Sequence, residues 1–102
     1  MAQAGVKPLE IVWLRKALLN LDEEANYIEQ DDPRAAQQVV ARVVHSVELL
    51  RHQPGLGRPG RVPGTRELHV ANTHYLIPYR VRAKRIEILR VFHTSRKPPS
   101  QW

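Results

Sequence analysis

The chain contains no cysteine and no long hydrophobic run. Without cysteine it can form no disulfide, no thiolate nucleophile and no cysteine-based metal site, and such a sequence suits a reducing compartment. No stretch approaches the roughly 18 consecutive apolar residues that a membrane-spanning helix requires, and residues 1–8 contain no hydrophobic segment typical of a signal peptide. We therefore expect a soluble, cytoplasmic protein that is neither anchored in a membrane nor held by disulfides.

Acidic side chains are scarce in the second half of the chain. Residues 1–50 carry five basic and eight acidic residues, a net charge of −3, whereas residues 51–102 carry eleven basic and two acidic ones, a net charge of +9. The chain contains twelve Arg and four Lys, and guanidinium groups bind phosphates and carboxylates in bidentate pairs. This one-sided distribution predicts a surface that binds a polyanion, either nucleic acid or an acidic protein partner.

The first half of the sequence predicts one strand and a helical hairpin. Residues 9–13 are β-prone, and over residues 14–28 the apolar positions recur with the period of one helix face. Asp32 is a favourable N-cap and Pro33 a favourable first residue for a second helix, which keeps the same apolar period through Leu50. Because the joint between them is short, we expect the two helices to pack antiparallel.

The second half predicts a loop and three antiparallel strands. Residues 52–65 contain four of the five glycines and three of the eight prolines, which excludes a helix or a central strand there. Apolar and polar residues then alternate in three segments joined by hairpin-length turns, namely residues 65–71, 75–82 and 85–93. The last segment is apolar on both faces and is expected at the centre of the sheet. Pro78 predicts an edge or a bulge, because proline cannot donate to the ladder.

Together these segments predict an α+β fold that consists of an N-terminal strand, an α-helical hairpin and a three-stranded antiparallel meander. The two helices can cover one face of the sheet. The other face is then expected to be open and edged by arginines. Residues 94–102 include two consecutive prolines and are expected to be irregular.

Six arginines are the main candidates for binding an anionic target, because they lie in the loop, within the predicted strands or just beyond the last one. Strand pairing could bring several of them to one end of the sheet, as a rim that binds phosphate or carboxylate groups. The alternative is a solvated basic surface with scattered ion pairs, but the large charge asymmetry favours the rim. The six residues are Arg58, Arg61, Arg66, Arg80, Arg82 and Arg96.

Two further residues are candidates for acid–base chemistry. Cleavage of RNA through its 2′-hydroxyl needs a base, an acid for the leaving oxygen and cations beside the phosphorane. Glu67 could act as the base and His93 as the acid. Arg66 or Arg96 could supply the cation. The alternative, which is favoured because the sequence does not show that these side chains meet, is a structural Arg66–Glu67 ion pair and a histidine that ends a strand with a hydrogen bond.

No cofactor or metal site is expected. The glycine-rich loop lacks the Gly-Lys-Ser/Thr sequence of a P-loop and does not lead into a helix. The remaining histidines form two pairs without a third ligand, and two histidines make a poor metal site. These pairs are His45 with His52 and His69 with His74. Tyr75 and Tyr79 alternate on one strand face, where they could stack on bases, but core packing is the favoured interpretation.

Four segments together resemble a known family. They are residues 27–33 with Ala35 and Ala36, residues 56–68 with the sequence Leu-Gly-Arg-Pro-Gly-Arg-Val-Pro-Gly-Thr-Arg-Glu-Leu, residues 75–81 and residues 86–93. On these motifs the chain is similar to the RelE/ParE superfamily of toxins from bacterial type II toxin–antitoxin modules. The resemblance implies a single toxin domain over residues 9–99, with residues 1–8 and 100–102 as tails.

This resemblance implies a small growth inhibitor of the kind found in plasmid-stabilization modules. A cognate antitoxin would neutralise it by wrapping an acidic or amphipathic segment around it. RelE-like members cleave messenger RNA on the ribosome, whereas ParE-like members inhibit DNA gyrase and lack that catalytic set. The ParE-like branch is favoured because Tyr75-Leu76 stands where RelE-like enzymes tend to carry a catalytic arginine. In addition, Arg58 and Arg61 with glycine and proline replace the lysine-rich segment of those enzymes.

The expected function is therefore a toxin that poisons DNA gyrase by binding rather than by turnover. The first alternative is a ribosome-dependent endoribonuclease, for which the candidate catalytic residues are Arg66, Glu67, His93 and Arg96. The second alternative is a basic nucleic-acid-binding protein without toxicity. None of the three requires a cofactor.

Overall fold

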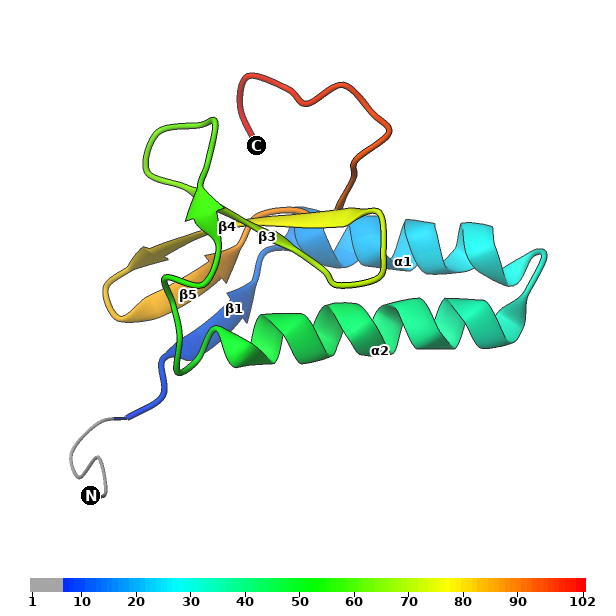
Figure 1. Ribbon diagram of the computed structural model, residues 1–102, viewed down its shortest axis with the longest axis horizontal. Helices are drawn as coiled ribbons and strands as arrows, with labels where there is room; N and C mark the ends of the chain where they lie inside the picture. The colour runs from blue at the N-terminus through cyan, green and yellow to red at the C-terminus, as the bar shows by residue number, and fades with distance from the viewer. Residues whose placement is uncertain (1–6) are drawn as a thin grey trace.

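The computed structural model describes residues 7–102 and shows an α+β fold in which two helices pack on one face of a sheet (Figure 1). The elements are β1 (Glu10–Trp13), α1 (Arg15–Glu29), α2 (Pro33–Leu49), β2 (Arg58–Pro59), β3 (Arg66–His69), β4 (Tyr75–Arg82), β5 (Arg85–Ile88) and β6 (Phe92–His93). The predicted fold class is confirmed, with the short strand β2 added ahead of the meander. Within residues 7–102, neither helix has the length and hydrophobicity needed to cross a membrane.

The helical hairpin forms as the apolar period predicts. The Asp32 carboxylate accepts a hydrogen bond from the Ala35 backbone N–H at 3.1 Å, and Pro33 opens α2, so α2 is capped where expected. α1 has no side-chain cap. It begins directly after β1, where the Leu14 N–H donates to the Ile88 carbonyl at 3.0 Å. The start of α1 is thus fixed by the sheet rather than by a capping residue.

Apolar side chains of the helices and of the sheet form one core. Val43 and Val47 of α2 are completely buried, and they belong to the same cluster as Ile77 and Tyr79 of β4. Tyr75 and Tyr79 are 5% and 0% exposed, which confirms the core packing predicted for both tyrosines. The helix-facing side of the sheet is therefore its hydrophobic side.

The strands of the sheet follow the order β1-β5-β4-β3-β2. β3, β4 and β5 form the predicted antiparallel meander, and β1 pairs parallel with β5, with Ile11 opposite Ile86. β5 therefore lies between β1 and β4, which confirms the central position predicted from its apolar character. The N-terminal strand β1 and the C-terminal meander thus form one sheet.

The last predicted strand, residues 85–93, is interrupted, and this corrects the sequence prediction. β5 ends at Ile88 and β6 begins at Phe92, four positions later, whereas the facing residues of β4 are three positions apart. Pro78 lies at this point: its carbonyl accepts a hydrogen bond from the Leu89 N–H at 2.9 Å, but it has no N–H with which to continue the ladder. The predicted bulge is confirmed, although the extra residue lies in the partner strand.

Charged residues lie on the face of the sheet that points away from the helices. Glu87 of β5 is on this face because both of its neighbours, Ile86 and Ile88, belong to the helix-facing core, and Glu67 of β3 is on it because the next residue, Leu68, does. The tail, residues 94–102, is irregular as predicted and returns to this side, where Trp102 contacts Phe92 with ring centres 5.3 Å apart. In Figure 1 the C-terminus lies beside the loop that joins β2 and β3.

The loop between α2 and β2 is held against the sheet by Tyr79. The Tyr79 hydroxyl donates to the Pro54 carbonyl at 2.7 Å and accepts a hydrogen bond from the Gly57 N–H at 2.8 Å. Arg66 donates to the Gly57 carbonyl at 2.8 Å. A side chain at Gly57 would collide with the tyrosine, because its Cβ would lie 2.7 Å from a ring carbon. These contacts fix the point at which the arginine-bearing loop leaves the core.

We predict that Tyr79→Phe lowers the free energy of unfolding by about 1–3 kcal/mol, because the Gly57 N–H and the Pro54 carbonyl lose a buried partner. Urea unfolding followed by circular dichroism measures the change. The control is Tyr27→Phe: Tyr27 is 72% exposed, and its replacement should change stability by less than about 0.5 kcal/mol. Equal stability of the two variants would contradict the role given to the Tyr79 hydroxyl.

Candidate functional site

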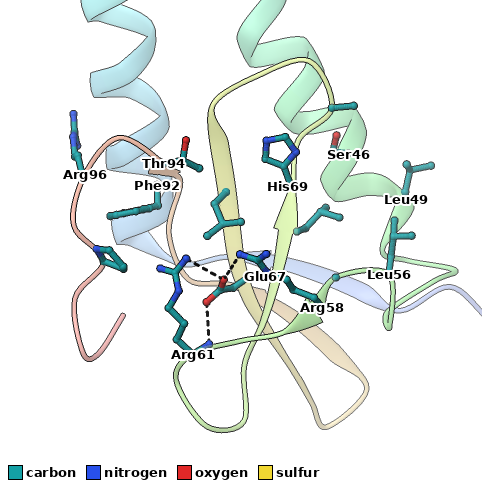
Figure 2. Close-up of a pocket in the computed structure, with 15 residues that line it drawn as sticks. Ser46, Leu49, Leu56, Arg58, Arg61, Glu67, His69, Phe92, Thr94 and Arg96 are labelled. Carbon is teal, nitrogen blue, oxygen red and sulfur yellow. Dashed lines mark hydrogen bonds and ion pairs between the residues drawn. The ribbon is translucent and has the colours of Figure 1, made fainter.

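A groove of about 520 Å³ opens between β3, the C-terminal end of α2, the loop before β2 and the segment after β6. Figure 2 shows that Arg58, Arg61 and Glu67 lie together at one end of it, apart from Arg96, and that apolar side chains line its walls. Leu49 and Leu56 are 44% and 45% exposed, so an uncovered apolar surface lies beside positive charge. The principal apolar residues of the groove are Leu49, Leu56, Leu76, Phe92 and Pro98.

Glu67 anchors the charged end of the groove. Its side chain is only 1% exposed, and it accepts hydrogen bonds from the Arg61 backbone N–H at 3.0 Å and from the Arg58 guanidinium at 3.3 Å. The Arg61 guanidinium lies 3.9 Å from the same carboxylate (Figure 2). One buried carboxylate thus holds two exposed guanidinium groups at the groove, and a net positive charge remains available to a ligand.

A second buried carboxylate, Glu87, organises the other arginines of the same face. Arg80 donates to it at 2.6 Å, and Arg82 and Arg85 each approach it to 3.4 Å. The hydrogen bond from Arg80 holds the pKa of Glu87 below its ordinary value, although burial by itself would raise that pKa. Glu87 therefore stays ionised at neutral pH and is surrounded by three cations.

Arg66 and Arg96, both candidates from the sequence, have partners outside these two clusters. Arg66 donates to the Gly57 carbonyl and so holds the loop. Arg96 donates to Glu24 of α1 at 3.0 Å, and the Tyr75 hydroxyl donates to the other oxygen of Glu24 at 2.9 Å. Burial, assisted by Glu24, raises the pKa of Tyr75, so its phenol remains protonated. Arg96 thus ties the beginning of the tail to α1.

The structure does not bring Glu67 and His93 together. Glu67 faces the groove, whereas His93 lies on the opposite face of the sheet. There His93 pairs with Tyr75, and the ring centres of these two residues are 5.3 Å apart. The Nδ1 atom of His93 accepts a hydrogen bond from the Ser95 N–H at 3.1 Å. These two side chains therefore do not form the acid–base pair that RNA cleavage would require.

Glu67 pairs with different arginines from the one that the sequence suggested. Residues adjacent in a strand point to opposite faces, so Arg66 turns toward the loop and Glu67 toward Arg58 and Arg61. Glu87 is not among the site residues predicted from the sequence. The sequence does contain a signal for its role, because Glu67 and Glu87 are the two acidic residues of the basic half of the chain. Each lies at the centre of an arginine cluster.

We predict that Glu87→Gln lowers the free energy of unfolding at neutral pH by about 1–3 kcal/mol, because three arginines lose their shared carboxylate. The folded-state pKa of Glu87 is depressed, so its contribution is complete above the unfolded-state pKa and is lost as the pH falls through the folded-state pKa. The urea stabilities of variant and parent should therefore converge as the pH falls below the ordinary pKa of a glutamate and on through the depressed pKa of Glu87.

The control for this experiment is Glu29→Gln, which removes an exposed carboxylate at the end of α1. It should change stability at neutral pH by less than about 0.5 kcal/mol. A loss in Glu87→Gln that is equally large at acidic and neutral pH would show that the glutamate acts through packing rather than through its charge.

The sequence matches known toxins over most of its length. Residues 11–98 match the family model for the ParE toxin of the type II toxin–antitoxin system parDE. The candidate toxin Y4kP of Sinorhizobium fredii is 48% identical over 89 residues, which cover 87% of this chain and 92% of that protein. Toxin RelE2 of Caulobacter vibrioides is 33% identical over 87 residues, which cover 85% of this chain and 97% of that protein.

Two solved structures share the fold. A chain of the chromosomal ParDE system from P. aeruginosa matches with a TM-score of 0.77 and 33% identity, over 83% of this chain and 95% of that one. A chain of the toxin–antitoxin complex RelBE2 from Mycobacterium tuberculosis matches with a TM-score of 0.63 and 26% identity, over 84% and 98% of the two chains. The resemblance found in the sequence is confirmed, and the chain belongs to the ParE toxin family of type II toxin–antitoxin systems, within the RelE/ParE superfamily.

Proposed function

We propose that the chain is a ParE-like toxin that inhibits DNA gyrase by binding it. The observation that supports this proposal is that the residues needed for RNA cleavage are separated or engaged. Glu67 is enclosed by Arg58 and Arg61, and His93 lies on the other face of the sheet. A toxin that acts by binding needs instead an exposed surface that combines apolar and cationic groups, and the groove combines them.

A RelE-like ribosome-dependent endoribonuclease is the second candidate, because of a hollow on the helix side of the sheet. His93, Ser95 and Arg96 line this hollow together with Glu23 and Glu24, so an imidazole and a guanidinium lie in one place. The similarity to toxin RelE2 supports the same alternative. The charge of Arg96 is already matched there by Glu24, at 3.0 Å, which makes it a weaker phosphate ligand than an unpaired arginine.

We also infer that a cognate antitoxin covers the groove. The two solved relatives come from a ParDE system and a RelBE2 toxin–antitoxin complex. An amphipathic segment would complement the groove if its apolar side faced Leu49 and Leu56 and its carboxylates faced Arg58 and Arg61. The formal net charge of +6 favours an acidic partner over a basic one.

We predict that the purified chain inhibits the supercoiling of relaxed plasmid DNA by gyrase in proportion to its concentration, and that His93→Ala inhibits equally well. The histidine lies outside the groove and outside both arginine clusters, so a toxin that acts by binding does not need it. Gel electrophoresis of the plasmid topoisomers measures the activity. Unchanged supercoiling at a molar excess of the chain would contradict gyrase as the target.

A translating extract separates the two candidate functions. If the chain acts by inhibiting gyrase, messenger RNA should stay intact when the chain is added to the extract. Codon-phased cleavage of the message that disappears in His93→Ala would instead establish the ribonuclease. Arg66→Ala is less informative, because Arg66 also holds the loop through Gly57.

We predict that Leu56→Asp weakens binding of the antitoxin, taken as the product of the neighbouring reading frame, by about 30-fold or more. Loss of a buried leucine contact removes roughly 2 kcal/mol, and the new carboxylate repels an acidic segment. Isothermal titration calorimetry with the antitoxin measures the change. The control is Val81→Asp: Val81 is 42% exposed but lies outside the groove, so its replacement should leave affinity within about threefold. Equal losses in both variants would contradict a groove-bound antitoxin.

A further inference from the structure

The hairpin between β4 and β5 gathers cations at one end of the molecule. Figure 1 shows this hairpin at the opposite end of the longest axis from the joint between α1 and α2, and Glu29, Asp31 and Asp32 lie at that joint. The hairpin carries four cations and a single acidic residue, Glu87, which pairs with three of them. The four cations are Arg80, Arg82, Lys84 and Arg85.

Two features of the hairpin lower the stability of the fold. Arg82 and Arg85 are directly opposite each other in the strand register, and like charges in that position destabilise a sheet. The turn residues Ala83 and Lys84 have φ angles of 53° and 61°, a left-handed conformation that glycine and asparagine adopt at lower cost. Backbone strain of this kind tends to be retained where it serves a function.

Glu87 holds the arginines in one cluster without neutralising them. Arg80, Arg82 and Arg85 lie within 2.6, 3.4 and 3.4 Å of its carboxylate, yet their side chains remain 36%, 61% and 46% exposed. A single carboxylate cannot use all the N–H donors of three guanidinium groups. The cluster therefore presents preorganised donors and excess positive charge to the solvent.

The chemistry of this cluster matches phosphate better than it matches a peptide. A protein segment gains much of its affinity from apolar anchors, and on this side of the hairpin the strand positions outward from Arg80 are occupied by Arg82, Arg85 and Glu87. Val81 is exposed but belongs to the opposite face. A phosphodiester backbone requires only positive charge and hydrogen-bond donors.

We propose that the β4–β5 hairpin binds the phosphodiester backbone of nucleic acid, at a site separate from the apolar groove. The four cations supply the charge, and Glu87 fixes the direction of the guanidinium groups. Contacts of this type bind without regard to base sequence. The site is independent of whether gyrase is the target, because it is defined by direct binding to nucleic acid alone.

The test uses the purified full-length chain, made by cell-free synthesis, and fluorescence anisotropy with a labelled DNA duplex of about 20 base pairs and a single-stranded RNA of the same length. The variant is Arg82→Gln/Arg85→Gln. The matched control is Arg34→Gln/Arg42→Gln, which removes two arginines from α2. At about 0.1 M salt the hairpin variant should bind at least about tenfold more weakly, and its slope of log affinity against log salt should fall by about two.

The α2 control should lose less than about threefold in affinity, and whichever probe binds more tightly identifies DNA or RNA as the better ligand. The hairpin variant should still unfold cooperatively, because Arg80 keeps its hydrogen bond to Glu87 and the substitution also removes two opposed like charges. The proposal is overturned if the hairpin variant and the α2 control weaken equally, or if the parent chain binds neither probe at low salt. It is also overturned if the hairpin variant loses binding of the antitoxin while it retains binding of nucleic acid.

Discussion

Two buried carboxylates, Glu67 and Glu87, determine where the arginines of the open sheet face lie. Removing a carboxylate from water costs several kcal/mol, and a single exposed cation does not offset that cost. Each glutamate is accordingly met by more than one guanidinium group, two at Glu67 and three at Glu87. The carboxylates also fix the orientation of the arginines, because a guanidinium that binds a carboxylate on one side presents its remaining N–H donors on its other side.

The same arrangement favours binding over hydrolysis. A general base must accept a proton near neutral pH, and the pKa that suits this task lies close to the working pH. Glu87 is shifted in the wrong direction, because the hydrogen bond from Arg80 lowers its pKa. Glu67 accepts hydrogen bonds from Arg58 and from the backbone of Arg61, so its lone pairs are used within the protein. The two acidic residues of the basic half are thus organisers of cations rather than proton acceptors.

Features set by local sequence could be predicted, and those set by distant contacts could not. The helix period, the Asp32–Pro33 start of α2 and the effect of Pro78 each depend on a few neighbouring residues, and all three appear in the structure. The Glu24–Tyr75–Arg96 network joins side chains 51 and 72 positions apart, so no sequence spacing indicates it. The parallel pairing of β1 with β5 is likewise a result of the complete fold.

The predicted Arg66–Glu67 ion pair is wrong, because the two residues are neighbours in β3 and neighbours in a strand point to opposite faces. On the open face, β4 passes from Pro78, which is opposite Glu67 at the charged end of the groove, to Arg82 at the hairpin. Four residues of strand span about 13 Å, which exceeds the Debye length of about 10 Å near 0.1 M salt. Carboxylates that bind Arg58 and Arg61 would therefore be partly screened from Arg82, and full neutralisation of both surfaces requires a partner that extends along β4.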